Sequence, residues 1–333
     1  PINPSDMWPM FGPANLSKAT LSDDKSVLTA PLYPGMLSRI KPRLDQTLPI
    51  GNEGAGVVVA AGDSEQAQAL MGKTVAVLTG ASYTQYCCVP VQACIVHHDG
   101  TTPHAAASSF VNPLTALGMV ETMRMEGHTA LVHTAAASSL GIMLNKVCIK
   151  EGVALVNIVR KQEQVDLLTK LGAKFVVNSS SESFKKDLYK AIDATGATLA
   201  FDAIGGGELA GDILATMEAV GSKDATGFNT YGSVDNKQVY IYGGLDFSPT
   251  LLNRAFGMTW SVGGWLLMRF LGKLKPARVG ELYKRVADEI NTTFAIESTV
   301  ELSFEEAMTP EVIEKYNAKT TGGKYIVNPN KGS

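Results

Sequence analysis

The segment Thr129-Ala130-Leu131-Val132-His133-Thr134-Ala135-Ala136-Ala137-Ser138-Ser139-Leu140-Gly141 decides the fold. It predicts a short apolar strand, a turn of small residues and a helix that continues to Ile149. A second strand at 154–159 follows, and then a helix that ends at Gly172. Further strands are predicted at 175–177, 198–202 and 238–242, with a helix carrying Phe184, Leu188 and Ile192 between the first two. Strands that alternate with helices in this way form right-handed crossovers, so we expect a doubly wound parallel sheet.

Residues 51–100 have a different pattern, in which short β-strands follow one another. Runs at 55–60, 74–78 and 83–89 are rich in β-branched and aromatic residues, and glycines separate them. Such spacing is typical of a small barrel or sandwich. After residue 275 the order is helix, strand, helix and a last strand at 324–327, and we expect this tail to return to the first domain.

The composition limits the possible functions. The chain has 333 residues, of which 45% are hydrophobic and 18% are charged, so it can bury a sizeable core. Its 29 Lys and Arg residues against 32 Asp and Glu residues give a net charge of −3. Such a charge provides no basic field for nucleic acid, and no apolar run has the length and composition of a membrane span. We therefore expect neither a nucleic-acid partner nor a membrane.

The cysteines and histidines argue against a disulfide framework and against a metal site. Cys87, Cys88, Cys94 and Cys148 form no C-x-x-C pair and have no histidine at ligand spacing. We expect them to be small buried residues, and the protein to lie in the reducing cytoplasm.

The turn after the first strand of the alternating region is a candidate phosphate-binding site. Small residues let the backbone approach a pyrophosphate, and the N–H groups of the following helix point towards it. We expect the phosphates to be held by Ala136, Ala137, Ser138, Ser139 and Leu140. The full G-x-G-x-x-G pattern is absent, so close packing of helix against strand is the alternative explanation. The position of the turn, after a strand and before a helix, favours the phosphate site.

The end of the second strand indicates which dinucleotide binds. Sites for NAD usually place a carboxylate there to accept from the ribose 2′-OH. This chain instead has Arg160 and Lys161, and no carboxylate until Glu163. An arginine and a lysine suit a 2′-phosphate, whereas two solvated cations would be unfavourable at a helix start. We therefore predict NADP(H).

The order of several motifs resembles the medium-chain dehydrogenase/reductase superfamily, in its zinc-independent quinone-reductase branch. These motifs are N-P-S-D at 3–6, G-N-E-G-A-G-V-V at 51–58, N-P-L-T-A at 112–116, L-G-A at 171–173 and G-K-Y-I-V at 323–327. The resemblance implies an α/β protein with a GroES-like β-rich catalytic domain and a doubly wound Rossmann domain. We place the catalytic domain at 1–111 and 272–333 and the Rossmann domain at 112–271, with the substrate cleft between them. The resemblance also implies a homodimer, to which the segment 258–267 contributes an edge strand.

Individual site residues also follow from the resemblance. Asn3 resembles the active-site asparagine of the branch and Thr115 the threonine near the nicotinamide, so both are predicted to take part in catalysis. Tyr242, Gly243 and Gly244 are expected to line the nicotinamide ribose, Asn178 to lie beside the adenosine, and Lys319 to contact the cofactor where quinone reductases often have arginine. The alternatives are that Asn178 and Tyr242 cap strands and that Lys319 is a solvated cation.

The sequence departs from the family pattern at several places. Asn52 stands where zinc members carry a histidine, and the N-P-S-D stretch lacks their cysteine, so the chemistry is expected to be metal-free. Serines replace the two usual glycines of the phosphate turn, and the tyrosine that often follows N-P-x-D is replaced by Trp8 or absent. The segment 7–50 is longer than usual, and we expect it to overhang the cleft as a loop. We also expect the opening strands of the family to be missing before Pro1, where a targeting segment remains possible.

These features predict an NADPH-dependent, zinc-independent oxidoreductase that transfers hydride to a quinone or another conjugated carbonyl acceptor. A 2-enoyl thioester reductase is the first alternative, because N-E-G, V-N-P-x-T-A and N-I-V-R resemble those enzymes, although their active-site tyrosine is missing near 11–13. A catalytically idle NADPH-binding protein with an interaction role is the second. No residue stands out as the proton donor.

Overall fold

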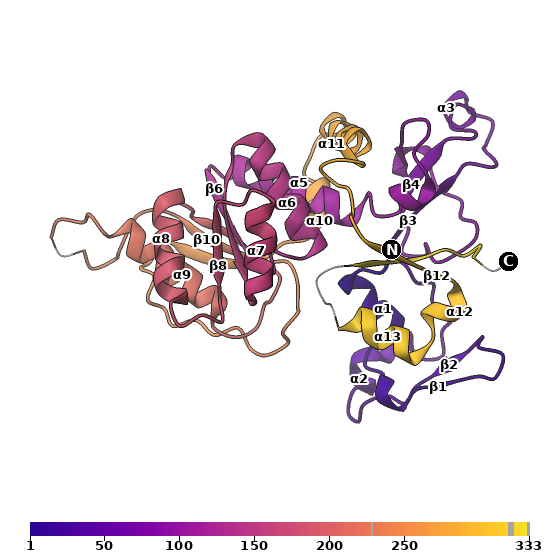
Figure 1. Cartoon of the computed structure of the whole chain (residues 1–333), viewed down its shortest axis with the longest axis horizontal. Helices are drawn as coiled ribbons and strands as arrows, with labels where there is room; N and C mark the ends of the chain where they lie inside the picture. Colours follow the sequence, from indigo (N-terminus) through magenta and orange to yellow (C-terminus); the bar gives the residue numbers. More distant parts are fainter. Residues whose placement is uncertain (228, 319–322, 332–333) are drawn as a thin grey trace. The chain divides into compact units, whose positions relative to one another are not determined.

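The computed structural model describes residues 1–227, 229–318 and 323–331. The chain divides into two compact units, Pro1–Val111 with Glu281–Ser333 and Asn112–Gly280 (Figure 1). Residues 272–280, which the sequence places with the first domain, belong to the second unit. There Arg278 Nη2 lies 2.7 Å from Glu121 Oε1. This ion pair ties the segment to the helix that opens the second unit.

The second unit is built on a six-stranded sheet in which every strand pair is parallel. Its strands are β6 (Ala130–His133), β7 (Ala154–Val159), β8 (Phe175–Asn178), β9 (Leu199–Asp202), β10 (Lys237–Ile241) and β11 (Trp260–Gly264). Their spatial order is β11-β10-β9-β6-β7-β8, which is the strand order of the doubly wound dinucleotide-binding sheet. The chain runs outward from β6 to β8 and then returns past β6 to β9. The order therefore reverses between β6 and β9.

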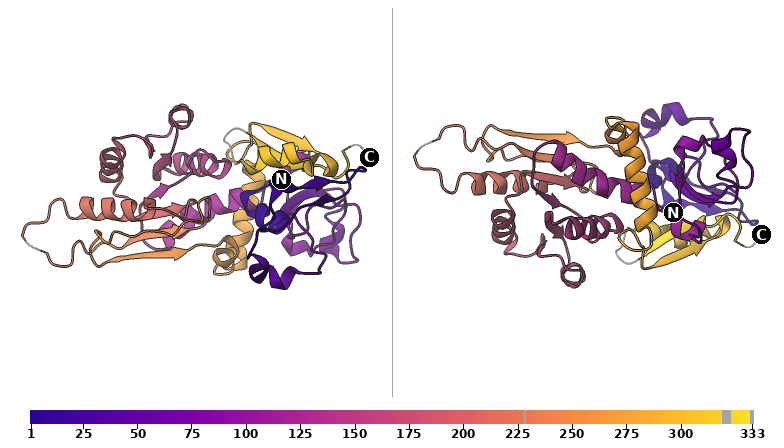
Figure 2. Two further views of the ribbon diagram at one scale, coloured as in Figure 1. Left: turned by 90° about the horizontal axis from the view of Figure 1, so that it is seen from below. Right: turned by 90° about the horizontal axis from the view of Figure 1, so that it is seen from above.

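Helices cover both faces of this sheet (Figures 1 and 2). They are α5 (Val111–Met125), α6 (Ser139–Glu151), α7 (Gln162–Lys170), α8 (Phe184–Thr195) and α9 (Leu209–Gly221). After β11 come α10 (Leu267–Leu271) and α11 (Pro276–Glu289), and α11 continues past Gly280 into the first unit. The helix predicted to end at Gly172 ends at Lys170, with Leu171 as its C-cap, and Gly172 follows with a φ of +90°, a conformation that favours glycine.

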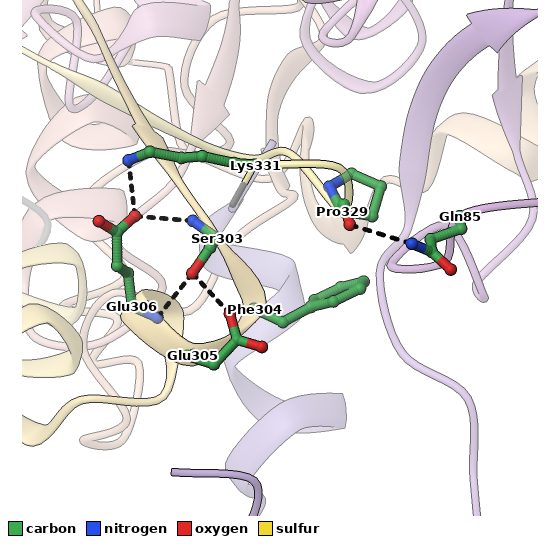
Figure 3. A pocket seen from close by; sticks show the side chains of 7 residues that line it. All are labelled: Gln85, Ser303, Phe304, Glu305, Glu306, Pro329 and Lys331. Carbon is green, nitrogen blue, oxygen red and sulfur yellow. Dashed lines mark hydrogen bonds and ion pairs between the residues drawn. The ribbon is translucent and has the colours of Figure 1, made fainter. Parts of the chain in front are cut away.

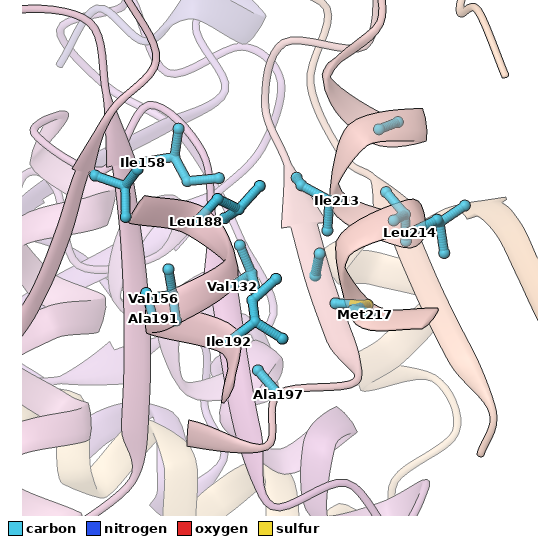
Figure 4. Close-up of a cluster of buried hydrophobic side chains, with 14 of the residues drawn as sticks. Val132, Val156, Ile158, Leu188, Ala191, Ile192, Ala197, Ile213, Leu214 and Met217 are labelled. Carbon is cyan, nitrogen blue, oxygen red and sulfur yellow. The ribbon is translucent and has the colours of Figure 1, made fainter. Parts of the chain in front are cut away.

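A hydrophobic cluster of 17 buried residues lies on the face covered by α8 and α9 (Figure 4). Alternate strand residues such as Val156 and Ile158 point into it, because successive strand side chains face opposite sides. The helices contribute residues three or four positions apart, which share one helical face: Leu188, Ala191 and Ile192 from α8, and Ile213, Leu214 and Met217 from α9.

The opposite face packs against α5, α6 and α7. Near its centre Phe201 is fully buried between Tyr240 and Trp265. Trp265 Nε1 donates to Thr122 Oγ1 on α5 at 3.1 Å. Phe201 comes from β9, between β6 and β10, so these contacts place α5 over the middle of the sheet.

The described residues of the first unit form three small sheets. β3 (Glu53–Val57), β4 (Thr74–Leu78) and β5 (Ile95–Val96) form an antiparallel sheet, β1 (Thr20–Leu21) pairs with β2 (Leu28–Thr29), and β12 (Thr299–Leu302) pairs in parallel with β13 (Lys324–Val327). The helical elements are η1 (Pro4–Asp6), α1 (Met7–Phe11), η2 (Leu16–Lys18), α2 (Leu37–Ile40), η3 (Lys41–Arg43), α3 (Glu65–Gln68), η4 (Val91–Ala93), α4 (Pro103–Ala106), α12 (Phe304–Ala307) and α13 (Pro310–Asn317). The predicted α/β class with a Rossmann-type sheet is confirmed.

Three expectations about the first unit are wrong. The run 83–89 forms no strand, because no described segment offers it a ladder of hydrogen bonds. Cys87 and Cys88 are consequently exposed rather than buried, Cys94 is half-buried, and all four cysteines are free. The segment 7–50 is not a plain loop, because it forms short helices and the β1–β2 pair, and its apolar residues pack into the core of the unit.

None of the described helices combines the length and the apolar composition that crossing a membrane requires.

A buried ion pair closes the loop between α9 and β10. Lys237 is fully buried, and its Nζ lies 2.7 Å from Glu218 Oε2. Glu218 also accepts from Ser222 Oγ and from the N–H and Oγ of Ser233. Burial by itself raises the pKa of Glu218, but the Lys237 ammonium and these donors outweigh it and lower the pKa to about 2.

The Glu218 carboxylate therefore stabilises the fold in a pH-dependent way. Its folded pKa lies below the unfolded value, so its contribution is complete above about pH 5 and is lost as the pH falls towards 2. At pH 6 we expect Glu218→Gln to be less stable than the parent by roughly 2 kcal/mol, and this difference to shrink at pH 3. Urea unfolding at both pH values measures it, with the exposed Glu182→Gln as the control. A difference that does not change with pH would contradict the assignment.

Candidate functional site at the carboxyl edge of the parallel sheet

The turn between β6 and α6 brings backbone close to backbone. Ser138 caps α6, because its Oγ accepts from the N–H of Gly141 at 3.1 Å. A Cβ on Gly141 would lie 2.2 Å from the carbonyl oxygen of Ala136, so only glycine fits there. The N–H groups of Ser139 and Leu140, in the first turn of α6, have no acceptor within the helix. They remain available to an anion, so the turn and these two N–H groups fit a pyrophosphate.

The predicted turn residues contribute in different ways. Ala136 and Ala137 are buried against Val159 and Leu168, so their methyl groups face the core. The N–H of Ala136 is already used, because it donates to the carbonyl of Ile158 at 3.1 Å. The exposed Ser138 and the half-buried Ser139 are the members whose side chains reach the surface.

Arg160 and Lys161 follow β7 at the same edge of the sheet. Their backbone N–H groups donate to Gln164 Oε1 at 3.1 and 3.3 Å, which fixes the start of α7. Both side chains are exposed, and neither forms an ion pair within the part of the chain that the structure describes. Two uncompensated cations next to a phosphate turn provide the fork geometry and the positive charge that a 2′-phosphate requires.

Asn178 is the last residue of β8 and pairs with Val159 of β7. Its Oδ1 accepts from the N–H of Ser180 at 3.0 Å, so the side chain closes a local turn. Asn178 thus lies at the same edge, and its contact with adenosine stays a prediction.

Thr115 lies in the second turn of α5 and is buried. Thr122, further along this helix, accepts from Trp265, which follows β11. Glu126, directly after the helix, accepts from Tyr240 of β10. Followed from its carboxyl end back to its amino end, α5 therefore approaches the carboxyl ends of the strands. Thr115 is seven residues before Thr122, about 10 Å further along the helix, and so belongs to the same edge.

The ends of β9 and β10 add polar groups to this edge. The carboxylate of Asp202 accepts from Thr134 Oγ1 at 2.7 Å and from the N–H groups of Ile204 and Gly205. Tyr242 follows β10, and its Oη lies 2.8 Å from Nε2 of the fully buried His133. Gly243 and Gly244 come next in the chain.

Asn3 lies in the first unit, within a buried cluster of charged groups. Its Nδ2 donates to Glu53 Oε1 at 2.9 Å, and its Oδ1 accepts from Lys324 Nζ. Glu53 Oε2 accepts from the N–H groups of Phe110 and Val111 at 2.9 and 2.8 Å. Burial lowers the pKa of Lys324, although the charge of Glu53 opposes this shift.

The second buried carboxylate of this cluster belongs to Asp6. It accepts from the N–H groups of Asn3 and Asn52, both at 2.8 Å, and burial raises its pKa. Both polar ends of the Asn3 carboxamide are thus bonded within the first unit, and its predicted catalytic role stays a prediction.

Comparison with models of known protein families gives no match. Among solved structures, a Mesorhizobium loti protein provisionally assigned as an NADPH:quinone reductase is 28% identical, with a TM-score of 0.70 over 85% of this chain and 78% of that one. The mitochondrial 2-enoyl thioester reductase heterodimer Etr1p/Etr2p from Candida tropicalis is 18% identical, with a TM-score of 0.65 over 98% and 88%. A complex of Etr1p with NADP and crotonyl-CoA is 18% identical, with a TM-score of 0.63 over 98% and 88%.

The chain has the medium-chain dehydrogenase/reductase fold. In open parallel sheets ligands usually bind outside the carboxyl ends of the strands where the strand order reverses, so the edge at β6 and β9 is the candidate site. Thr115, Ser138, Arg160, Asn178 and Tyr242 all lie at this edge. Asn3 lies in the first unit, and Lys319 lies outside the described residues.

Sequence reasoning missed His133, Thr134 and Asp202. A signal for them exists, since each is a polar residue at or directly after the end of a predicted parallel strand, where such residues face a common edge. Their bonds to one another depend on which strands become neighbours, and that is decided only in the folded sheet.

Two of the hollows among the described residues of the first unit differ in their lining. One, of about 580 Å³, is lined almost entirely by apolar side chains, including Met10, Phe11, Leu28 and Met308. The other, of about 450 Å³, is polar, and its side chains bond mainly to one another, as Lys331 does to Glu306 at 2.6 Å (Figure 3). Within the described residues no group of His, Cys, Asp or Glu has the arrangement of a metal site.

The phosphate turn provides a direct test of its packing. We expect Gly141→Ala to lower the free energy of unfolding by about 1–3 kcal/mol, because its Cβ overlaps the carbonyl of Ala136. The matched control is Gly280→Ala on α11, whose Cβ would meet nothing within 4 Å and which should stabilise by about 0.5–1 kcal/mol. Urea unfolding followed by circular dichroism compares the two, and similar effects at both positions would contradict the packing argument.

Proposed function

We propose that this protein is an NADPH-dependent oxidoreductase that transfers hydride to a quinone or another conjugated carbonyl acceptor without zinc. The observation that carries the proposal is the uncompensated Arg160–Lys161 pair at the end of β7, next to a phosphate turn at the end of β6. The likeness to a structure assigned as an NADPH:quinone reductase, at 28% identity, supports it.

Each group at the carboxyl edge has a role in this proposal. The first turn of α6 and the serine hydroxyls hold the pyrophosphate, and Arg160 and Lys161 hold the 2′-phosphate. Thr115 and the segment 242–244 hold the nicotinamide end. Bound NADPH supplies the hydride, and the protein contributes by orienting it towards the acceptor.

The residue at the position where zinc members of the family carry a histidine supports a reaction without a metal. Asn52 stands there, and its Nδ2 donates to Ser5 Oγ at 2.9 Å while its backbone N–H donates to Asp6. A neutral amide that is already bonded is a poor zinc ligand compared with histidine or cysteine.

A 2-enoyl thioester reductase remains the second candidate. The observation that favours it is the match of the Candida tropicalis enzyme over 98% of this chain, although 18% identity shows only a common fold.

The cofactor assignment predicts a charge-specific loss in Arg160→Ala. Removing the guanidinium should weaken NADPH binding about tenfold and leave NADH binding unchanged, because only NADPH carries the 2′-phosphate. Titration calorimetry measures both constants. The control is Lys174→Ala, an exposed cation that directly precedes β8, at the opposite edge of the sheet. Equal losses for the two cofactors would refute the assignment.

A spectrophotometric assay of NADPH oxidation with benzoquinone and with crotonyl-CoA separates the candidate activities. We expect turnover of the quinone. Turnover of the thioester alone would establish the second candidate instead. Tight NADPH binding without turnover of either acceptor would indicate a catalytically idle, NADPH-binding interaction protein.

We also propose a homodimer in which β11 of one copy pairs with β11 of the other. β11 bonds only to β10 among the described strands, and Met258, Leu266 and Met268 around it are exposed. Trp265 N–H donates to the carbonyl of Ile241, and donors alternate along a strand, so the N–H of Val262 points away from β10.

Sedimentation should find the parent at twice 35.4 kDa. Val262→Pro should shift it towards the monomer, because it removes an outward donor without removing a bond to β10. Val262→Ala, which keeps the donor, is the control. A monomeric parent would refute the proposal.

A further inference from the structure

The ends of β6, β9 and β10 are joined by one buried polar network. His133 ends β6 and Thr134 follows it, Asp202 ends β9, and Tyr242 directly follows β10. Thr134 Oγ1 donates to Asp202 Oδ1 at 2.7 Å and accepts from the N–H of Ala203 at 2.8 Å. The N–H of Tyr242 donates to the carbonyl of Asp202 at 2.9 Å. Three strands that are far apart in the sequence are thus fixed to one another at their carboxyl ends.

His133 supports the ring of Tyr242 from two strands away. The two rings are stacked, with centroids 5.8 Å apart and planes inclined by 18°, and His133 Nε2 lies 2.8 Å from Tyr242 Oη. Burial lowers the pKa of His133 to about 3 and raises that of Tyr242. Both groups are therefore neutral near pH 7. The Tyr242 hydroxyl is engaged by this contact, which makes it a support for the loop rather than a free acid.

The loop after β9 packs closely against the loop after β10. The N–H of Leu245 donates to the carbonyl of Ala203 at 3.1 Å. A Cβ on Gly243 would lie 2.7 Å from the same carbonyl oxygen, so glycine is required there. Asp202 holds the β9 loop through the N–H groups of Ile204 and Gly205. The position of residues 242–244 is therefore set by β9 from one side and by His133 from the other.

We propose that His133 and Asp202 are positioning residues for the nicotinamide half of the cofactor. They fix residues 242–244 relative to the phosphate turn, which follows His133 and Thr134 directly in the chain. The inference rests on the proposed function, because it assumes that NADPH lies along this edge. It adds that His133 and Asp202 act through Tyr242 and the two glycine-containing loops.

The test compares two ligands on the full chain. NADPH reports on both halves of the site, whereas adenosine 2′,5′-bisphosphate reports only on the adenosine half near Arg160. Tyr242→Phe and His133→Leu should weaken NADPH binding about tenfold and change adenosine 2′,5′-bisphosphate binding less than twofold. His133→Gln, whose carboxamide offers both a donor and an acceptor to Tyr242 Oη, should recover part of the loss.

A matched control lies at the opposite edge of the same sheet. His128, just before β6, is buried, and its Nδ1 lies 2.7 Å from Oγ1 of Thr198, just before β9. His128→Leu removes the same kind of contact far from the phosphate turn. It should lower the melting temperature and leave the ratio of the two binding constants unchanged.

The outcomes are distinct. A selective loss of NADPH binding in Tyr242→Phe and His133→Leu supports the inference, and equal changes for both ligands, or none, overturn it. If His133→Leu does not fold, Tyr242→Phe and His133→Gln decide in the same way. If the parent binds neither NADPH nor adenosine 2′,5′-bisphosphate, the proposed function itself is refuted, and with it the positioning role of His133 and Asp202.

Discussion

All six strands of the second unit run parallel, so their carboxyl ends and the loops that follow them meet at one edge. Most of the candidate site depends on this constraint. The phosphate turn, the cation pair, Asn178 and Tyr242 are separated by up to about a hundred residues, yet each directly follows a strand or ends one. In doubly wound sheets a reversal of strand order, such as the one between β6 and β9, separates the helices that leave on either side, and ligands usually bind at that position. A site built from several loops can therefore form although no two of these loops are close in sequence.

Close approach of backbone to backbone is the second constraint. Dinucleotide sites usually satisfy it with glycines, but this turn uses alanines, serines and the single Gly141. Ser138 caps the helix through its side chain, and Ala135 takes a positive φ of 50°, where glycine would be less strained. The tight turn is thus kept although the usual glycine pattern is lost. The loops after β9 and β10 show the same constraint at Gly243, which faces the carbonyl of Ala203.

Buried charge that is fully bonded is a third constraint, and the first unit depends on it at the cluster around Asn3. Glu53 and Lys324 are both buried, and the carboxamide of Asn3 bridges them. Buried charges are tolerated when every one is bonded, and Glu53 completes its set with the N–H groups of Phe110 and Val111, where α5 begins. The motifs that resemble the family's N-P-x-D and N-E-G segments therefore have a structural explanation in this chain, through bonds between residues some 50 positions apart. A catalytic contribution from Asn3 would have to come from an amide that is already bonded at both ends.

The sequence by itself determined the elements whose residues repeat regularly. The strands at 74–78, 154–159 and 324–327 were predictable to the residue, because alternation and apolar runs are local properties. The local order of small residues and cations also indicated the phosphate turn and the cofactor type. Only the tertiary structure decided that 83–89 forms no strand and that Cys87 and Cys88 are exposed, since a strand exists only where another segment completes its hydrogen bonds. It also decided the contact of His133 with Tyr242, 109 residues away, because that contact depends on which strands become neighbours in the sheet.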